Sequence, residues 1–159
     1  MEILEISKTN AISAYEKAAP KRKKLLSDLF GKKVFQKNVL ERIKTYEDAC
    51  EDQGITPLDE TDFLFLPEVD QKHAFAAHKI NTIIRSLNEG WVPDWNNGSQ
   101  PKYYVWYKWS GSGSGFSYRV CVYHFDYSFV GSRLHFKTRE LAEYFGKTFT
   151  KEINDYFII

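Results

Sequence analysis

The chain has 159 residues, a length at which a single domain with one core is expected. Hydrophobic residues make up 43% and aromatic residues 16%, which excludes a wholly disordered chain because enough apolar surface is present to offset the entropy of ordering. With 22 Lys and Arg against 21 Asp and Glu, the overall charge excludes a global attraction to nucleic acid or an anionic membrane. The charge is uneven along the chain: +4 over residues 1–48, −6 over 49–72 and +3 over 73–159.

Cysteine usage and the chain's start bear on the compartment. Cys50 and Cys121 are far apart and fit no metal spacing, so reduced thiols are expected rather than a disulfide framework. The first residues carry acids where a signal peptide needs basic residues followed by an apolar run, and no run of 18 apolar residues occurs. We therefore predict a cytoplasmic protein with no membrane partner.

The first half of the chain is predicted to be helical. Ser7 or Thr9 caps a short helix, Pro20 begins a second helix that Gly31 ends, and a third helix spans 40–53 before Gly54. Residues 55–70 hold two prolines and five acids around an apolar run at 63–66, and we expect a loop with an apolar plug. A longer helix is predicted over 71–89, before Gly90.

The second half is predicted to form an antiparallel sheet and a closing helix. Residues 103–109 and 116–125 are rich in Tyr, Trp, Val and Phe, which favour strands, and the serine–glycine run between them predicts a hairpin loop. A third short strand is predicted over 133–137, after which Thr138 caps the last helix. The expected fold is α+β: N-terminal helices, an antiparallel meander of three or more strands and a C-terminal helix. We predict a single domain over 1–159, with a helical part (1–54), an acidic loop (55–70) and a helix–sheet–helix part (71–159).

Several motifs resemble phosphate-binding or metal-binding sites, but the residues around them do not fit such a site. The glycines at 111–115 are followed by a strand pattern rather than by the helix a phosphate loop requires. His73 and His78 stand five residues apart on one helix, about 140° around its axis, and cannot share a metal. The acids of 55–70 lack the spacing of a calcium loop and indicate a solvated surface. No metal site and no cofactor is predicted.

A catalytic set would have to come from Cys121, His124 and Asp126. A nucleophile and its base need to lie within hydrogen-bond reach, whereas residues 121 and 124 of one strand point to opposite faces. No catalytic residue is therefore assigned. The basic run at 20–24 resembles a small nucleic-acid or localisation patch, but the solvated face of an amphipathic helix explains it more simply.

The aromatic segment 91–95 and the strands after it are the most informative feature. Strand alternation predicts one core face, made of Tyr103, Val105, Tyr107, Trp109, Tyr118, Val120, Val122, Leu134 and Phe136. The opposite face would mix flat rings with cations, as a platform for stacked bases and phosphates does. The alternative is that the N-terminal helices cover this face as well. The candidate binding residues are Tyr104, Trp106, Lys108, Arg119, Tyr123 and Arg133, with Trp91 and Trp95 beside them.

Four stretches carry a resemblance that spans most of the chain. They are 24–32 (KLLSDLFGK), 42–50 (RIKTYEDAC), 87–95 (LNEGWVPDW) with 102–104 (KYY), and 131–146 (GSRLHFKTRELAEYFG). Together they resemble a family of hypothetical proteins from gut Bacteroidetes, their prophages and crAss-like phages. The resemblance implies an accessory protein of a phage or mobile element in a bacterial cytoplasm. It implies no activity, cofactor or site residue.

These observations favour a non-enzymatic binding module that uses the ring-and-cation face to contact a single-stranded nucleic acid or a protein. The alternative is a structural or interaction protein that forms a homo-oligomer through the aromatic sheet. A third hypothesis is a small enzyme using His124, Asp126 or Cys121, and it has the least support because no base, nucleophile and orienting group come together in the sequence.

Overall fold

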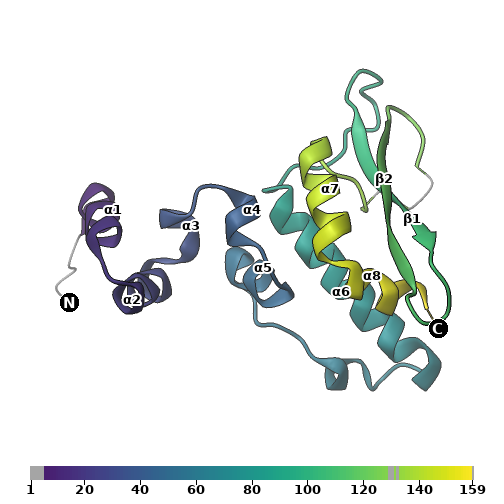
Figure 1. Ribbon diagram of the computed structural model, residues 1–159, viewed down its shortest axis with the longest axis horizontal. Helices are drawn as coiled ribbons and strands as arrows, with labels where there is room; N and C mark the ends of the chain where they lie inside the picture. Colours follow the sequence, from purple (N-terminus) through teal and green to yellow (C-terminus); the bar gives the residue numbers. More distant parts are fainter. Residues whose placement is uncertain (1–5, 129–130, 132, 159) are drawn as a thin grey trace. The chain divides into compact units, whose positions relative to one another are not determined.

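A computed structural model describes residues 6–128, 131 and 133–158 of the chain (Figure 1). The chain divides into two compact units, which are described separately: unit 1 is Met1–Arg42 and unit 2 is Ile43–Ile159. No helix in the described ranges is both long enough and apolar enough to cross a membrane.

Unit 1 consists of short helices: α1 (Lys8–Lys17), α2 (Pro20–Phe30), α3 (Lys32–Phe35) and α4 (Val39–Arg42). Ser7 caps α1 by accepting a hydrogen bond from the backbone N–H of Asn10, as the sequence predicts, and Pro20 occupies the first turn of α2. Gly31 ends α2 with a positive φ of 79°, a conformation that favours glycine. The rings of Tyr15 and Phe35 stack with centroids 4.3 Å apart and hold α1 against α3.

Unit 2 begins with α5 (Tyr46–Gln53), η1 (Glu60–Phe63) and α6 (Glu68–Leu87). The prediction of one helix over 40–53 is wrong, because Thr45 takes an extended conformation and starts a new helix with a capping box to Asp48. The prediction for 55–70 is also wrong in part. Phe63 packs on Phe75, with ring centroids 5.5 Å apart, but Leu64 and Phe65 are 64% and 80% exposed rather than inserted as a plug.

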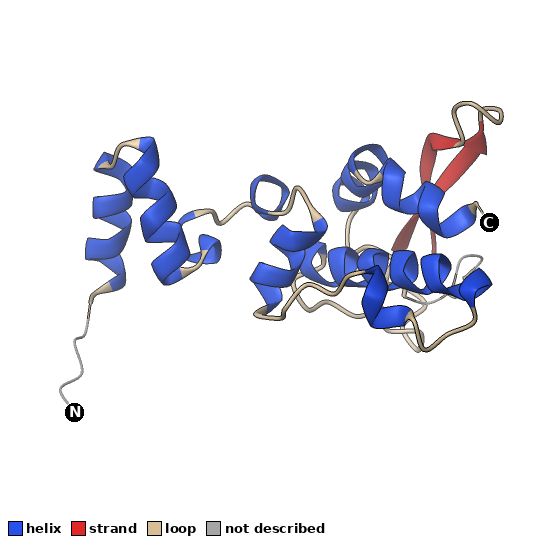
Figure 2. Cartoon of the chain, turned by 90° about the horizontal axis from the view of Figure 1, so that it is seen from below, coloured by secondary structure: helices blue, strands red, loops and turns tan. Residues whose placement is uncertain are grey.

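The sheet is a single antiparallel hairpin of β1 (Lys102–Trp109) and β2 (Phe116–His124), joined at the serine–glycine run (Figure 2). The α+β class and the hairpin loop are confirmed. A three-stranded meander is not present in the described residues. Segment 133–137 instead forms one isolated bridge, in which Phe136 and Tyr103 exchange backbone hydrogen bonds of 2.8 and 3.1 Å. The predicted closing helix is two helices, α7 (Arg139–Thr148) and α8 (Thr150–Phe157), which meet at Phe149.

A β-bulge decides which side chains share a face of the hairpin. Trp106 pairs with Val120 and Tyr107 pairs with Tyr118, so Arg119 is an extra residue on β2. One extra residue reverses the alternation from there on, because the side-chain period of a strand is two. The predicted faces are therefore wrong beyond the bulge. Cross-strand pairing puts Cys121 and Tyr123 on the face of Val105 and Tyr103, and puts Val120 and Val122 on the face of Trp106 and Tyr104.

The core of unit 2 lies between the helices and the first of these faces. Val105 and Cys121 are 7% and 2% exposed, and α7 approaches them closely at Gly146. A Cβ atom on Gly146 would lie 2.9 Å from Val105 Cγ1 and 2.6 Å from Tyr118 Cδ2. A glycine in this helix therefore allows the helix and the hairpin to pack at short distance.

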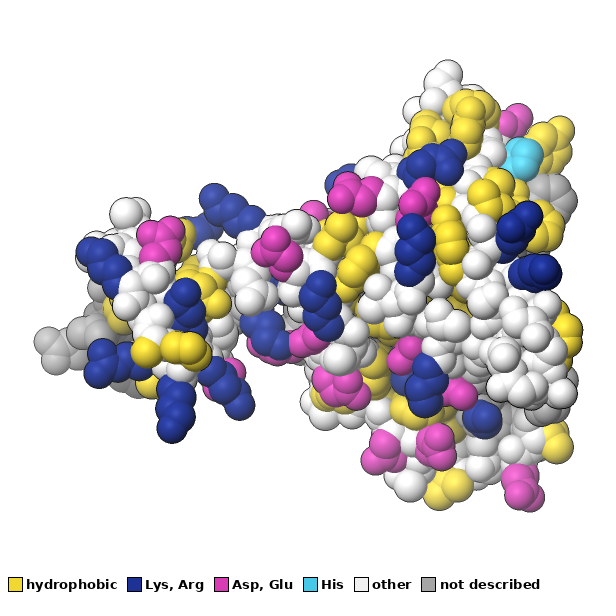
Figure 3. Space-filling view, viewed as in Figure 1, with side chains coloured by type: hydrophobic (Ala, Val, Ile, Leu, Met, Phe, Trp, Pro, Cys, Tyr) yellow, Lys and Arg dark blue, Asp and Glu magenta, His cyan; other side chains and the backbone are white. Residues whose placement is uncertain are grey.

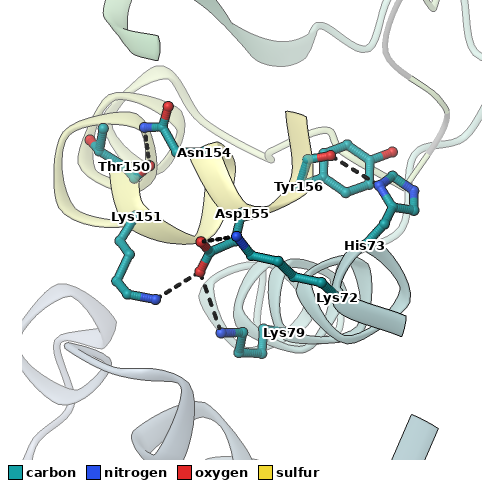
Figure 4. A network of polar contacts seen from close by, with 8 residues as sticks. All are labelled: Lys72, His73, Lys79, Thr150, Lys151, Asn154, Asp155 and Tyr156. Atoms are coloured by element: carbon teal, nitrogen blue, oxygen red, sulfur yellow. Dashed lines mark hydrogen bonds and ion pairs between the residues drawn. The ribbon is translucent and has the colours of Figure 1, made fainter. Parts of the chain in front are cut away.

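Helix α8 is joined to α6 by an ionic network (Figure 4). The carboxylate of Asp155 lies 2.7 Å from the ammonium of Lys151, 3.7 Å from that of Lys72 and 3.9 Å from that of Lys79. Partial burial disfavours the charged carboxylate, but the hydrogen bond from Lys151 and the nearby lysine charges outweigh it and hold the pKa of Asp155 below its usual value. His73 stacks on Tyr156 beside this network, with ring centroids 4.7 Å apart.

Candidate ring-and-cation site

The structure distributes the predicted ring-and-cation residues over several places. Trp106, Lys108 and Arg119 are exposed near the loop end of the hairpin, and together with Val120 we call them the hairpin patch. Tyr104 lies on the same face but is only 1% exposed, so it does not belong to a contact surface. Tyr123 is 45% exposed on the opposite face. The predicted continuous platform is therefore not formed.

Trp91, Trp95 and Arg133 come together elsewhere, in a cleft of about 540 Å³ that we call the Trp–Arg cleft. Its walls are the second half of α6, the segment 91–95 and the segment 133–135. The lining residues are Asn81, Ile84, Arg85, Asn88, Trp91, Val92, Pro93, Trp95, Arg133 and His135. A volume of this size is within the range of small-molecule and cofactor sites.

Buried Asn88 fixes two of these walls to each other. Asn88 follows the last residue of α6 and is 4% exposed. Its side-chain Nδ2 donates a 2.8 Å hydrogen bond to the carbonyl of His135, and its Oδ1 accepts a 3.0 Å bond from the backbone N–H of Lys137. The amide thus pairs with segment 135–137 as a strand would, and this sets where Arg133 and His135 stand relative to α6.

The wall that carries Trp95 is held by a buried lysine. Lys102 is fully buried, and its ammonium donates 3.0 Å hydrogen bonds to the carbonyls of Asn97 and Gln100. The same ammonium lies 5.4 Å from the centroid of the Trp95 ring, within the range of a cation–π contact. Trp95 also meets the ring of buried His135 edge to face, with centroids 5.2 Å apart. Trp95 is therefore a fixed part of the cleft.

The lining residues give the cleft a positive character. Arg85 and Arg133 are both exposed, and the buried ammonium of Lys102 contacts the ring of Trp95. No carboxylate is among the described residues that line it. Asp94, the acid next to Trp95 in sequence, accepts a 3.0 Å hydrogen bond from the backbone N–H of Asn96 within its own turn. Two indole rings beside two guanidinium groups suit a ligand that is planar and anionic.

Sequence reasoning missed Arg85 and Asn88, which both come from α6. The helical spacing predicts the apolar stripe of this helix, but it gives no reason to single out a polar residue beside that stripe. Arg85 and Arg133 line the same cleft only because segment 133–135 packs beside the end of α6 in the folded chain.

The candidate catalytic residues are not brought together. Cys121 pairs with Val105 and His124 with Lys102, which places the thiol and the imidazole on opposite faces, as alternation predicts. Burial raises the pKa of the Cys121 thiol, which disfavours the nucleophilic thiolate. His73 and His78 contact different partners. His73 Nδ1 lies 3.0 Å from the carbonyl oxygen of Tyr156, and His78 Nε2 lies 3.1 Å from the hydroxyl of Tyr46. No group of three or more metal-ligating side chains is found in the part of the chain that the structure describes.

Comparisons of this chain with protein-family models, with curated proteins and with solved structures found no match. The resemblance to hypothetical proteins of phages and their hosts therefore stays a prediction. The function has to be inferred from the cleft and the surfaces themselves.

Proposed function

We propose that this protein is a non-enzymatic module that binds single-stranded nucleic acid in the Trp–Arg cleft. The observation that carries the proposal is that Trp91, Trp95, Arg85 and Arg133 line one cleft. Unpaired bases stack on aromatic rings, and guanidinium groups form charge-assisted hydrogen bonds with phosphates. A single strand can present both groups, since its bases are free to turn out of a stack.

The cleft supports this role better than the hairpin patch does. The hairpin patch offers one exposed indole, Trp106, with Lys108 and Arg119 exposed at its side on a two-stranded hairpin. In the cleft, the ring of Trp95 is held by contacts with buried Lys102 and buried His135. A fixed ring loses little conformational entropy when a base stacks on it.

The test measures the binding of a fluorescein-labelled, mixed-sequence single strand by anisotropy at several salt concentrations. For single strands, log K falls with log salt with a slope of about −0.7 for each phosphate neutralised. We expect the pair Arg85→Gln and Arg133→Gln to make the slope shallower by about 1.4 and to weaken binding. Trp91→Ala should cost about 1–3 kcal/mol of binding free energy if a base stacks on that ring.

The matched control is the pair Lys108→Gln and Arg119→Gln, which removes two exposed cations from the hairpin patch. This control is expected to keep the slope of the wild-type protein. If the control pair flattens the slope and the cleft pair does not, the contact surface is the hairpin patch and the assignment to the cleft is wrong. Absence of saturable binding to both DNA and RNA would remove the proposed function altogether.

A further inference from the structure

Unit 2 exposes an apolar surface in an acidic setting at the start of α6. Leu64, Phe65 and Val69 are 64%, 80% and 77% exposed. Leu64 lies in a groove of about 270 Å³ together with Glu60 and Glu68. Residues 58–70 contain five acids and no Lys or Arg. We call this surface the acidic groove.

The lining of the acidic groove contains two carboxylates, Glu60 and Glu68, and one cation. That cation is Lys72, which lies 3.7 Å from the carboxylate of Asp155 in the network that joins α8 to α6 (Figure 4). Exposed apolar side chains with mainly acidic neighbours are typical of an interaction surface rather than of a solvated loop.

Unit 1 carries a surface of the opposite charge with the same apolar character. On α2, Leu25 and Leu29 are 57% and 66% exposed, and their spacing of four residues puts them on one side of the helix. Lys21 and Arg22, one turn earlier, flank that side. Four cations and one acid give α2 a charge of +3, and Figure 3 shows many Lys and Arg side chains over unit 1.

The basic first turn of α2 opposes the stability of the helix. The N-terminus of a helix carries a partial positive charge, so cations there are unfavourable and acids are favoured. Helix α2 has no acid in its first turn and no side-chain cap. Local stability therefore does not account for this arrangement, whereas an acidic partner does.

We propose that α2 of one copy of this chain docks in the acidic groove of a second copy. Leucines four residues apart with flanking cations match a groove that presents Leu64 and carboxylates, with exposed Phe65 next to Leu64 in the sequence. Apolar side chains at such helical spacing are the usual anchors of helix-in-groove recognition. The contact joins two different surfaces, so association proceeds head to tail and builds rings or open chains rather than a closed two-fold dimer. This inference is independent of the Trp–Arg cleft.

The test measures molar mass by sedimentation equilibrium over a range of protein concentrations. The wild-type chain is expected to exceed the monomer mass as concentration rises. The α2 variant (Lys21→Glu with Lys24→Glu) and the groove variant (Glu60→Lys with Glu68→Lys) are each expected to weaken association at least tenfold. An equimolar mixture of the two variants should associate again, because it contains one unchanged α2 with one unchanged groove and also pairs the reversed charges of one variant with those of the other.

Two exposed charge reversals outside the contact serve as controls: Lys8→Glu at the start of α1 and Glu140→Lys at the start of α7. Both should associate as the wild type does. The α2 variant places acids at a helix N-terminus, which favours the helix, so its effect does not come from unfolding of α2. Because Glu68→Lys places a cation at the start of α6, Leu64→Ser provides a second groove variant that leaves the charge unchanged.

A wild-type chain that stays monomeric at every concentration would overturn the proposal, and so would a variant mixture that stays monomeric. Loss of association in Trp106→Ser with wild-type behaviour of the α2 variant would assign the contact to the hairpin patch instead. Nucleic-acid binding can fail in the preceding test without affecting any of these outcomes.

Discussion

Replacing Asn88 tests whether one buried amide holds the Trp–Arg cleft together. Asn88→Ala removes the hydrogen bond to the carbonyl of His135 and the one from the N–H of Lys137, and leaves both backbone groups without that partner. Each bond contributes about 0.5–1.5 kcal/mol, and an unsatisfied buried group costs about 1–3 kcal/mol. We therefore expect the free energy of unfolding to fall by about 3 kcal/mol, allowing for partial access of water to the two backbone groups.

Tryptophan fluorescence during urea unfolding is a suitable assay, because all four tryptophans (Trp91, Trp95, Trp106 and Trp109) lie in unit 2. With a urea dependence of about 2 kcal/mol per molar, the unfolding midpoint should fall by about 1.5 M. Asn88→Asp keeps the acceptor for the N–H of Lys137 but turns a carboxylate oxygen toward the carbonyl of His135. It should destabilise unit 2 at least as much as the alanine variant does.

The matched control is Asn96→Ala, an exposed asparagine in the loop that leads to β1. It should change the midpoint by less than about 0.3 M, since exposed substitutions usually stay within about 0.5 kcal/mol. A loss below about 1 kcal/mol for Asn88→Ala would refute the reasoning, because it would mean that segment 135–137 is held without this amide.

Two further predictions concern stability. Gly146→Ala should lower the free energy of unfolding of unit 2 by about 1–2 kcal/mol in the same urea assay. Overpacking against Tyr118 and Val105 outweighs the gain of about 1 kcal/mol in helix propensity. A more stable variant would contradict the close approach of α7 to the hairpin. His78 provides a pH test: burial, and then the charge of Arg85, lower its pKa, so the unfolded chain binds the proton more readily. Stability should therefore fall as pH drops below about 6.5, the usual histidine pKa, and His78→Gln should reduce that fall between pH 7.5 and 5.5. An unchanged fall in the variant would assign it to other groups.

The sequence alone determined most of the local structure. Ser7, Pro20, Gly31, Gly54 and Thr138 act at helix ends as their capping chemistry predicts, because a cap depends on neighbours within four residues. The hairpin and its loop also follow from composition, since strand-forming residues flank a run of glycine and serine. The α+β class follows from the order of these elements.

Tertiary structure decided the faces of the hairpin and the place of the site. The bulge at Arg119 reverses the alternation of β2, and it is a property of the pairing between strands rather than of either sequence segment. Tyr104 is buried because its ring packs against His124 and His135, and the Trp–Arg cleft exists because Asn88 bonds to a segment 47 residues away. Local patterns carry no information about such long-range contacts, and for that reason the residue types of the site could be predicted but their arrangement could not.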